Sequence, residues 1–138
     1  IKFVQLADFL INKFFYKNVG KKHHWVDRLI WTEKQWIEYT SDKKVKTYVL
    51  KNNDDLAGYF ELITHRDKNE VEIAYLGLLE EYQNKKLGSY LLSSAIKNSF
   101  LIKPHRVWVH TCSLDHKNAL SNYISRGMKI FKKETVTV

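Results

Sequence analysis

The chain has a single cysteine, Cys112, among its 138 residues, so it cannot form an internal disulfide bond. Its six histidines are scattered and have no cysteine partners at zinc-binding spacing, and we therefore expect no metal site. No apolar run approaches the roughly 20 residues that cross a bilayer, so we expect no membrane partner. These absences favour a reducing, cytoplasmic compartment.

Residues 1–15 also lack the uninterrupted apolar core of a signal peptide, because Lys, Gln, Asp and Asn interrupt their apolar side chains. The chain starts with Ile1 and not with methionine, and we expect a short segment to precede it in the complete protein. The composition is typical of a globular protein, with 44% hydrophobic, 14% aromatic and 28% charged residues. Such a chain buries enough apolar surface to offset the entropy lost on folding, so we expect residues 1–138 to form one domain.

The chain is basic. It has 23 Lys and Arg residues against 15 Asp and Glu residues, a formal net charge of +8, and this balance favours anionic partners. The lysines are spread along the chain, however, and no run of five or more basic residues occurs. Three interpretations stay open: a solvated lysine-rich surface, a phosphorylated ligand, or nucleic acid.

Apolar spacing predicts both helices and strands. Residues recurring near a 3.6-residue period predict helices, and β-branched and aromatic runs with short polar separators predict antiparallel strands. Thr32 and Gln35 stand at capping-box spacing, and Gly20 is expected to end the first helix. The expected order is helix 4–16, helix 32–39, strands 45–51, 56–64 and 71–79, a helix between Gly88 and Pro104, strand 106–112, helix 115–126 and strand 128–138. We predict an α+β fold with a mixed, mostly antiparallel central sheet flanked by helices.

The loop from Gln83 to Ser89 joins an expected strand to an expected helix and contains two lysines. A helix N-terminus presents unpaired N–H groups and the positive end of the helix dipole, which favours phosphate. Many strand-to-helix loops of this kind bind nothing, so the physical argument alone leaves both interpretations open.

At this loop the sequence resembles the GNAT superfamily of acetyl-CoA-dependent N-acetyltransferases, whose motif is Q/R-x-x-G-x-G/A. The motif here reads Gln83-Asn84-Lys85-Lys86-Leu87-Gly88. In that family the loop amides hold the pyrophosphate of coenzyme A, and the resemblance implies this role for Gln83 to Ser89. Lys86 departs from the family's glycine. Its side chain either restricts the approach of the backbone to phosphate or adds a positive charge beside it.

Residues 118–128 resemble a second family segment, N-x-A-L-x-x-Y-x-x-x-G-F. The match is shorter by one residue after Asn118, and Met128 replaces the family's phenylalanine. In the family the tyrosine of this segment lies beside the coenzyme sulfur. The resemblance therefore implies coenzyme binding by Asn118 and Tyr123, and a general-acid role for Tyr123.

Residues 71–78 resemble the strand of histone-type members that begins A-E-I and carries the general-base glutamate, here Glu72. By the same resemblance, the backbone of Leu76, Gly77 and Leu78 pairs with pantetheine and polarises the thioester carbonyl. In a regular strand one face would carry Glu72, Ala74, Leu76 and Leu78. The alternative is that Glu72 is a solvated residue beside the turn at 65–69.

The family's first two helices and their joint wall the acceptor pocket, which implies acceptor contacts for His24, Trp25 and Asp27. Three other chemically active residues fit structural roles better: His110, His116 and the small, apolar Cys112.

The sequence thus predicts an N-acetyltransferase that uses acetyl-CoA as co-substrate and acetylates a primary amine of a small molecule or peptide by direct attack. We expect no nucleic-acid partner, and either a monomer or a homodimer. Two alternatives remain. One is a degenerate coenzyme A-binding domain without turnover, which Lys86 favours; the other is a basic module that binds nucleic acid or protein, which the net charge favours.

Overall fold

The computed structural model of the chain describes residues 2–6, 8–23, 25, 27–82 and 87–109. The expected helix 115–126 and strand 128–138 lie outside this part. The described elements are β1 (Lys2–Leu6), α1 (Phe9–His23), α2 (Glu33–Ser41), β2 (Val45–Asn52), β3 (Asp55–His65), β4 (Glu70–Leu78), the 3-10 turn η1 (Glu80–Tyr82), α3 (Leu87–Leu101) and β5 (Arg106–Val109).

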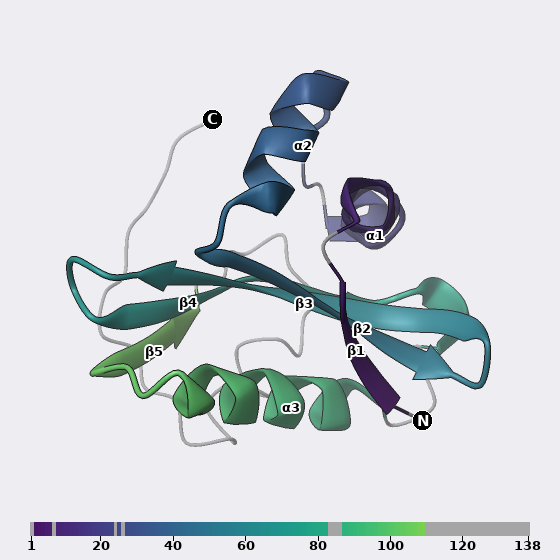
Figure 1. Cartoon of the computed structure of the whole chain (residues 1–138). Helices are drawn as coiled ribbons and strands as arrows, with labels where there is room; N and C mark the ends of the chain where they lie inside the picture. Colours follow the sequence, from purple (N-terminus) through teal and green to yellow (C-terminus); the bar gives the residue numbers. More distant parts are fainter. Residues whose placement is uncertain (1, 7, 24, 26, 83–86, 110–138) are drawn as a thin grey trace.

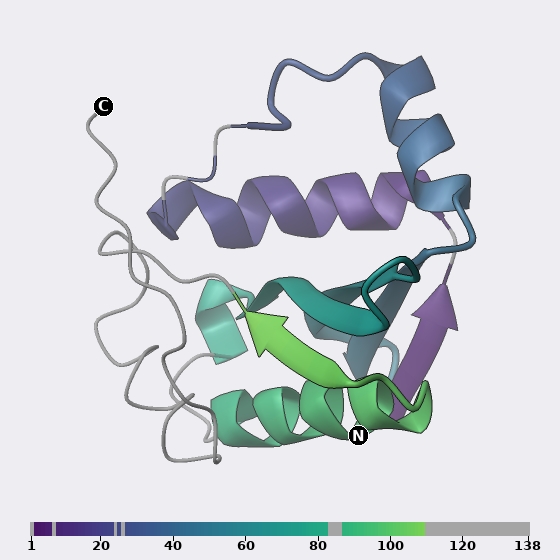
Figure 2. The same cartoon turned by 90° about the vertical axis from the view of Figure 1, so that its left-hand side faces the viewer.

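These strands form one sheet in the order β1-β2-β3-β4-β5. Neighbouring strands are antiparallel from β1 to β4, whereas β4 and β5 are parallel. Helices α1 and α2 cover one face of the sheet and α3 covers the other (Figure 1, and Figure 2 after a quarter turn). The mixed, mostly antiparallel sheet between helices confirms the α+β prediction.

The first element differs from the sequence prediction. Residues 2–6 form β1, which pairs with β2, and the first helix begins only at Phe9. Asp8 explains this start, because its carboxylate accepts a hydrogen bond from the N–H of Leu10 at 2.9 Å, as a residue that caps a helix does. The prediction that the helix starts at Val4 is wrong.

The expected stop at Gly20 is also wrong, because α1 continues to His23. A Cβ atom built on Gly20 would lie 2.7 Å from Cβ and Cε3 of Trp25. The glycine therefore makes room for the tryptophan that folds back on the helix, and it does not terminate the helix.

The second helix follows the prediction. The Thr32 hydroxyl accepts a hydrogen bond from the N–H of Gln35, and the Gln35 side chain accepts one from the N–H of Thr32, at 3.2 and 2.8 Å. This capping box satisfies two N–H groups that a helix start leaves unpaired. Trp36 then turns into the core, where only 1% of it is exposed.

Strand β4 contains a bulge that the sequence did not predict. Leu62 and Glu61 of β3 pair with Ile73 and Tyr75 of β4, so Ala74 between them has no opposing residue. An extra residue reverses the alternation of side chains beyond it. Glu72 therefore shares a face with Tyr75, and the expected common face of Glu72, Ala74, Leu76 and Leu78 is wrong.

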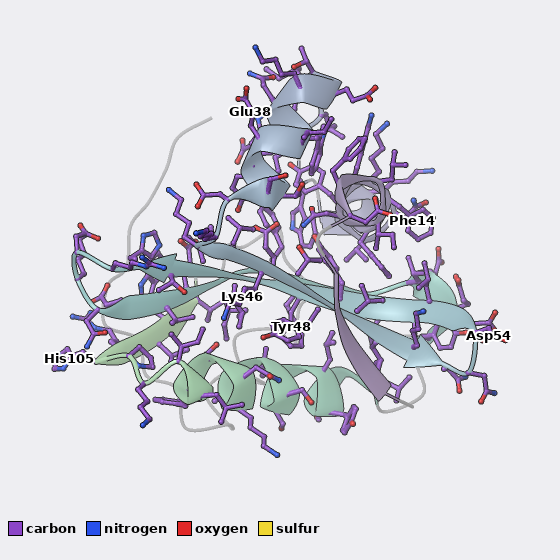
Figure 3. The ribbon with its side chains drawn as sticks, in the orientation of Figure 1. Phe14, Glu38, Lys46, Tyr48, Asp54 and His105 are labelled. Atoms are coloured by element: carbon purple, nitrogen blue, oxygen red, sulfur yellow. The ribbon has the colours of Figure 1, made fainter. Side chains whose placement is uncertain are left out.

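Pairing across the sheet identifies these two faces. Glu61 hydrogen-bonds to residues of α1 and α2, so Glu61, Tyr75 and Glu72 lie on the face covered by those helices. Tyr48 lies on the α3 side of the sheet and stacks on Phe60, which pairs with Leu76 (Figure 3). The bulge thus gives β4 an acidic residue on one face and apolar residues on the other.

No helix of the described segments is both long and apolar enough to span a membrane. Within the same residues, no cluster of three or more His, Cys, Asp or Glu side chains could hold a metal ion.

Candidate functional site

The edge of β4 beyond the bulge is the first feature of the site. Strand β5 pairs with β4 only from Glu70 to Ile73, and in the described residues β4 beyond Ala74 pairs with β3 alone. The segment from Leu76 to Leu78 lies in this single-sided stretch. A strand with an unpaired edge can receive another extended chain through its backbone N–H and C=O groups. Here that chain would lie next to the start of α3.

Two glycines fix the backbone at this edge. A Cβ atom on Gly77 would lie 2.2 Å from Cγ1 of Val19 in α1, and one on Gly58 would lie 2.8 Å from the carbonyl oxygen of Gly77. Any other residue at these two positions would push β3, β4 and α1 apart. The close packing holds in place the strand segment that the sequence assigned to the coenzyme.

The N-terminus of α3 is the second feature. Leu87, Gly88 and Ser89 lie in its first turn and are half-buried. Among the described residues, apart from its chain neighbours and the backbone of its own helix, no atom lies within 4 Å of a Cβ atom built on Gly88, so these residues leave the space beside this turn open. An anion could therefore approach the unpaired N–H groups of the helix start. The first half of the expected phosphate loop, residues 83–86, lies outside the described residues.

Glu72 is the third feature. Its Oε1 atom lies 2.9 Å from Nε2 of His65, and its side chain is 20% exposed. It lies two residues before the bulge, on the face of α1 and α2, opposite Trp108 of β5. The carboxylate is thus partly exposed on the helix-covered face of the sheet.

A buried polar network, which the sequence did not predict, lies on the same face. Arg28 forms a two-point ion pair with Glu61, with both nitrogen–oxygen distances at 2.8 Å. The Tyr39 hydroxyl donates to Glu61 at 2.6 Å, and the side-chain amide of Asn12 donates to Glu61 at 2.9 Å. We call Asn12, Arg28, Tyr39 and Glu61 the closed network.

Aromatic rings complete this network. The guanidinium carbon of Arg28 lies 4.2 Å from the ring centroid of Tyr39, 4.4 Å from that of Tyr75 and 4.9 Å from that of Trp31. Cations over aromatic faces are stabilised by the ring quadrupole, most strongly when water is excluded. The Arg28 side chain therefore fills the space between α1, α2 and β4.

Burial and the charge of Glu61 shift the pKa values of the residues around this network. Burial alone would lower the pKa of Arg28, but the hydrogen bonds and charge of Glu61 outweigh it and raise that pKa. Burial, followed by the negative charge of Glu61, raises the pKa of Tyr39. Burial is also the main cause of the raised pKa of Tyr75. Both phenols therefore stay protonated and neutral near neutral pH.

Of the expected acceptor contacts, Trp25 and Asp27 lie in the described part of the chain. Trp25 packs edge-on against Tyr75 of β4, with ring centroids 4.7 Å apart, and thus borders the bulge. Asp27 is exposed in the connection between α1 and α2. The remaining candidates lie outside the described residues: His24, Gln83, Asn84, Lys85, Lys86, His110, Cys112, His116, Asn118 and Tyr123.

The sequence did contain one signal for the closed network. Glu61 is the only acidic residue within the apolar run 56–64. A carboxylate in the middle of a buried strand needs partners, because an unpaired buried charge is strongly unfavourable. What the run could not indicate was which distant residues supply them.

A comparison with protein families shows which family the chain belongs to. The sequence model of the acetyltransferase (GNAT) family matches residues 7–128. The chain belongs to this family. The resemblance inferred from the three motifs is thus confirmed. No curated protein sequence is similar enough to count as a match.

Solved structures show the same fold as this GNAT chain. Aminoglycoside acetyltransferase meta-AAC0020 from an uncultured soil metagenomic sample, in complex with sisomicin, has a TM-score of 0.72 at 15% identity, covering 99% of this chain and 92% of that chain. An IAA acetyltransferase from Bacillus cereus ATCC 14579 has a TM-score of 0.72 at 22% identity, covering 95% and 78%. A transcriptional regulator from Bacillus halodurans C-125 reaches 0.74 at 14% identity, covering 99% and 98%. At these identities the likeness establishes the fold alone.

Proposed function

We propose that this protein transfers the acetyl group of acetyl-CoA to a primary amine by direct attack, without an acyl-enzyme. The observation that carries the proposal is the GNAT family match over residues 7–128. Two features of the described residues support it: β4 beyond Ala74 pairs among them with β3 alone, and none of their atoms fills the space beside Gly88 at the start of α3.

The end of β4 and the start of α3 would hold the coenzyme. The coenzyme supplies an activated acetyl thioester. The backbone from Leu76 to Leu78 would pair with its extended pantetheine arm, and N–H groups there would polarise the thioester carbonyl. The first turn of α3 fits the pyrophosphate, because a helix start favours anions and Gly88 leaves room for them. By the family resemblance the remaining contacts come from Gln83, Asn84, Lys85, Lys86, Leu87, Ser89, Asn118 and Tyr123.

Glu72 is the proposed general base. A primary amine with an ordinary pKa of about 10.4 is protonated at neutral pH and has no free lone pair, so a base must take one proton before attack. His65 engages Oε1 of Glu72, whose side chain remains partly exposed. The second carboxylate oxygen, Oε2, would take the proton, through a water molecule.

Tyr123 is the proposed general acid. The departing thiolate has a cysteine-like pKa of about 8.5 and a tyrosine hydroxyl one of about 10, so proton transfer is uphill by roughly 1.5 units, or about 2 kcal/mol. A positioned hydroxyl can supply this, and a hydrogen bond to the thiolate would help even without complete transfer.

The acceptor is proposed as an amine of a small molecule or a peptide. The name of meta-AAC0020 states that it is an aminoglycoside acetyltransferase, which supports a small-molecule amine here. Trp25 and Asp27, with His24, would line the approach to the bulge. The exposed Asp27 carboxylate suits a cationic amine.

Two measurements test the function. Acetyl-CoA should raise the melting temperature of the protein, since a ligand that binds only the folded state stabilises it by mass action. A panel of amines, from aminoglycosides and polyamines to peptides, is then incubated with acetyl-CoA and read by mass spectrometry for the acetylated product. Binding without any product would favour the degenerate domain. No thermal shift at millimolar acetyl-CoA, with salt-sensitive binding of DNA or RNA instead, would favour the basic nucleic-acid module.

A further inference from the structure

The contact between His65 and Glu72 belongs to neither the core nor the solvated surface. Nε2 of His65 lies 2.9 Å from Oε1 of Glu72, and the two side chains are 34% and 20% exposed. His65 is the last residue of β3, and Glu72 lies on the adjacent strand β4. Both face the side of the sheet where the proposed acceptor arrives.

The residues around the histidine favour this position. Its ring stacks on Trp108 of β5, with centroids 5.8 Å apart and planes inclined by 17°. Glu70, which pairs with His65 across the strands, is engaged by Arg106 through an ion pair at 3.2 Å. Glu70 is therefore a poor competitor for the imidazole, and His65 is directed to Glu72.

Other charged residues line a surface hollow together with the histidine. His65 lines a surface hollow between two turns, whose other lining residues are Asp42, Lys43, Lys44, Thr64, Arg66 and Asp67. Solvent in this hollow thus reaches His65, whose side chain is 34% exposed. Arg28, the buried cation of the same sheet face, is engaged by Glu61 at 2.8 Å. Among the described residues, His65 is the side chain that forms a hydrogen bond with Glu72.

A base must be held in position as well as ionised. The glutamate side chain has three rotatable bonds, and an unrestrained carboxylate spends most of its time away from the proton it must accept. A hydrogen bond from the imidazole to Oε1 fixes the carboxylate, and Oε2 has no hydrogen bond to the described residues. The stacking on Trp108 in turn fixes the imidazole.

We propose that His65 is the positioning residue for Glu72 and determines how well Glu72 acts as the base for the acceptor amine. This inference rests on the proposed function. During the step, the N–H bond of the ammonium group breaks and its electron pair stays on nitrogen. The intervening water molecule accepts that proton and passes one of its own to Oε2 of Glu72. Oε1 keeps its hydrogen bond from Nε2–H of His65 throughout, so His65 exchanges no proton with the acceptor.

Two substitutions separate this role from a merely structural one. In His65→Gln the side-chain amide nitrogen takes the place of Nε2 and can still donate a hydrogen bond to Glu72. In His65→Asn the amide nitrogen takes the place of Nδ1 and is too far from Glu72 to donate one. Removing one hydrogen bond to a charged group should lower kcat about tenfold in His65→Asn. We expect His65→Gln to stay within about twofold of the wild type, and KM for acetyl-CoA to be unchanged in both variants.

His105→Gln is the matched control. His105 is exposed at the outer end of the sheet and points away from it, so this variant should keep the wild-type kcat (Figure 3). Equal losses of kcat in His65→Gln and His65→Asn would overturn the proposal, because a hydrogen-bond donor would then not matter. Unchanged kcat in both would overturn it as well.

A spectroscopic readout separates this inference from the proposed function. A ring N–H bound to a carboxylate exchanges slowly with water and gives a downfield proton resonance. We expect this resonance in the wild type and in His105→Gln, and its loss in His65→Gln and Glu72→Ala. Absence of the resonance from the wild type would overturn the pairing, whatever the activity. If the resonance is present but no amine is acetylated, the proposed function fails, and with it the catalytic role of the pair.

Discussion

Two carboxylates on one face of the sheet have opposite surroundings. Glu61 of β3 is fully buried and receives hydrogen bonds from Arg28, Tyr39 and Asn12. Glu72 of β4 is partly exposed and has a hydrogen bond from His65. A carboxylate whose two oxygens both accept hydrogen bonds holds helices and strands together. A carboxylate that is partly exposed can exchange protons with solvent or a ligand. The same residue type is thus structural in the closed network and available for chemistry beside the bulge.

The largest effect should come from breaking the closed network. Glu61→Leu leaves the Arg28 guanidinium buried without its counter-charge, and we expect the free energy of unfolding to fall by about 3–5 kcal/mol. Urea denaturation measures this. The double variant Glu61→Leu with Arg28→Met should recover most of the loss, because no charge is then buried unpaired. A double variant as unstable as the single one would show that the ion pair itself, and not the orphaned arginine, carries the stability.

The same kind of change at the partly exposed Glu72 should lower the catalytic rate and leave stability nearly unchanged. In Glu72→Gln we expect kcat to fall about 10²- to 10⁴-fold, the usual scale for a lost general base. Activity should recover in part at high pH, where the amine loses its proton unaided. The free energy of unfolding should change by less than about 1 kcal/mol, since a partly exposed hydrogen bond contributes little. A stability loss as large as that of Glu61→Leu would erase the distinction between the two carboxylates.

This contrast also explains what the sequence could and could not predict. Strands β2, β3 and β4 and the capping box of α2 depend on residues close together in sequence, and all were predicted. The partners of Glu61 are 49, 33 and 22 residues away, on elements that meet only in the folded chain. Neither their pairing nor the bulge at Ala74 has a local sequence pattern. Strand β1 was missed because its apolar residues continue the pattern of α1 until Asp8 interrupts it.

For the candidate site, the resemblance to GNAT proteins indicated Glu72, the segment from Leu76 to Leu78 and the start of α3, but not how they are arranged. It could not indicate His65, because the contact with Glu72 requires the β3–β4 pairing that brings them together. Nor could it indicate that the bulge turns Leu76 away from the face of Glu72.

A smaller effect should appear at alkaline pH. Burial raises the pKa of Tyr39 and Tyr75 above the ordinary value of 10.0. Their stabilisation is therefore complete below pH 10. It is lost as pH rises above 10, because the unfolded chain releases these protons first. The slope should approach about 1.4 kcal/mol per pH unit for each tyrosine.

Tyr39→Phe tests this assignment in the closed network. The variant should lose about 1–3 kcal/mol at pH 7, since its hydroxyl joins Glu61 and Arg28. It should also unfold with a shallower dependence on pH above 10. Urea unfolding at pH 7 to 11 measures both. An unchanged slope in Tyr39→Phe would mean that this phenol already ionises normally in the folded protein.

The smallest effect on stability should come from a glycine at the open end of the site. A Cβ atom on Gly88 meets no other part of the described chain within 4 Å, and alanine favours helix more than glycine does, so Gly88→Ala should be neutral or more stable by up to about 1 kcal/mol. If the space is kept free for the coenzyme pyrophosphate, a larger side chain, as in Gly88→Leu, should weaken acetyl-CoA binding in calorimetry, whereas alanine, which the family motif also allows here, should not. Gly77→Ala is the contrasting variant. Its methyl group would lie 2.2 Å from Val19, so it should lower stability even without ligand. Unchanged acetyl-CoA affinity in Gly88→Leu would show that phosphate does not approach this turn, and the proposed binding mode would be wrong.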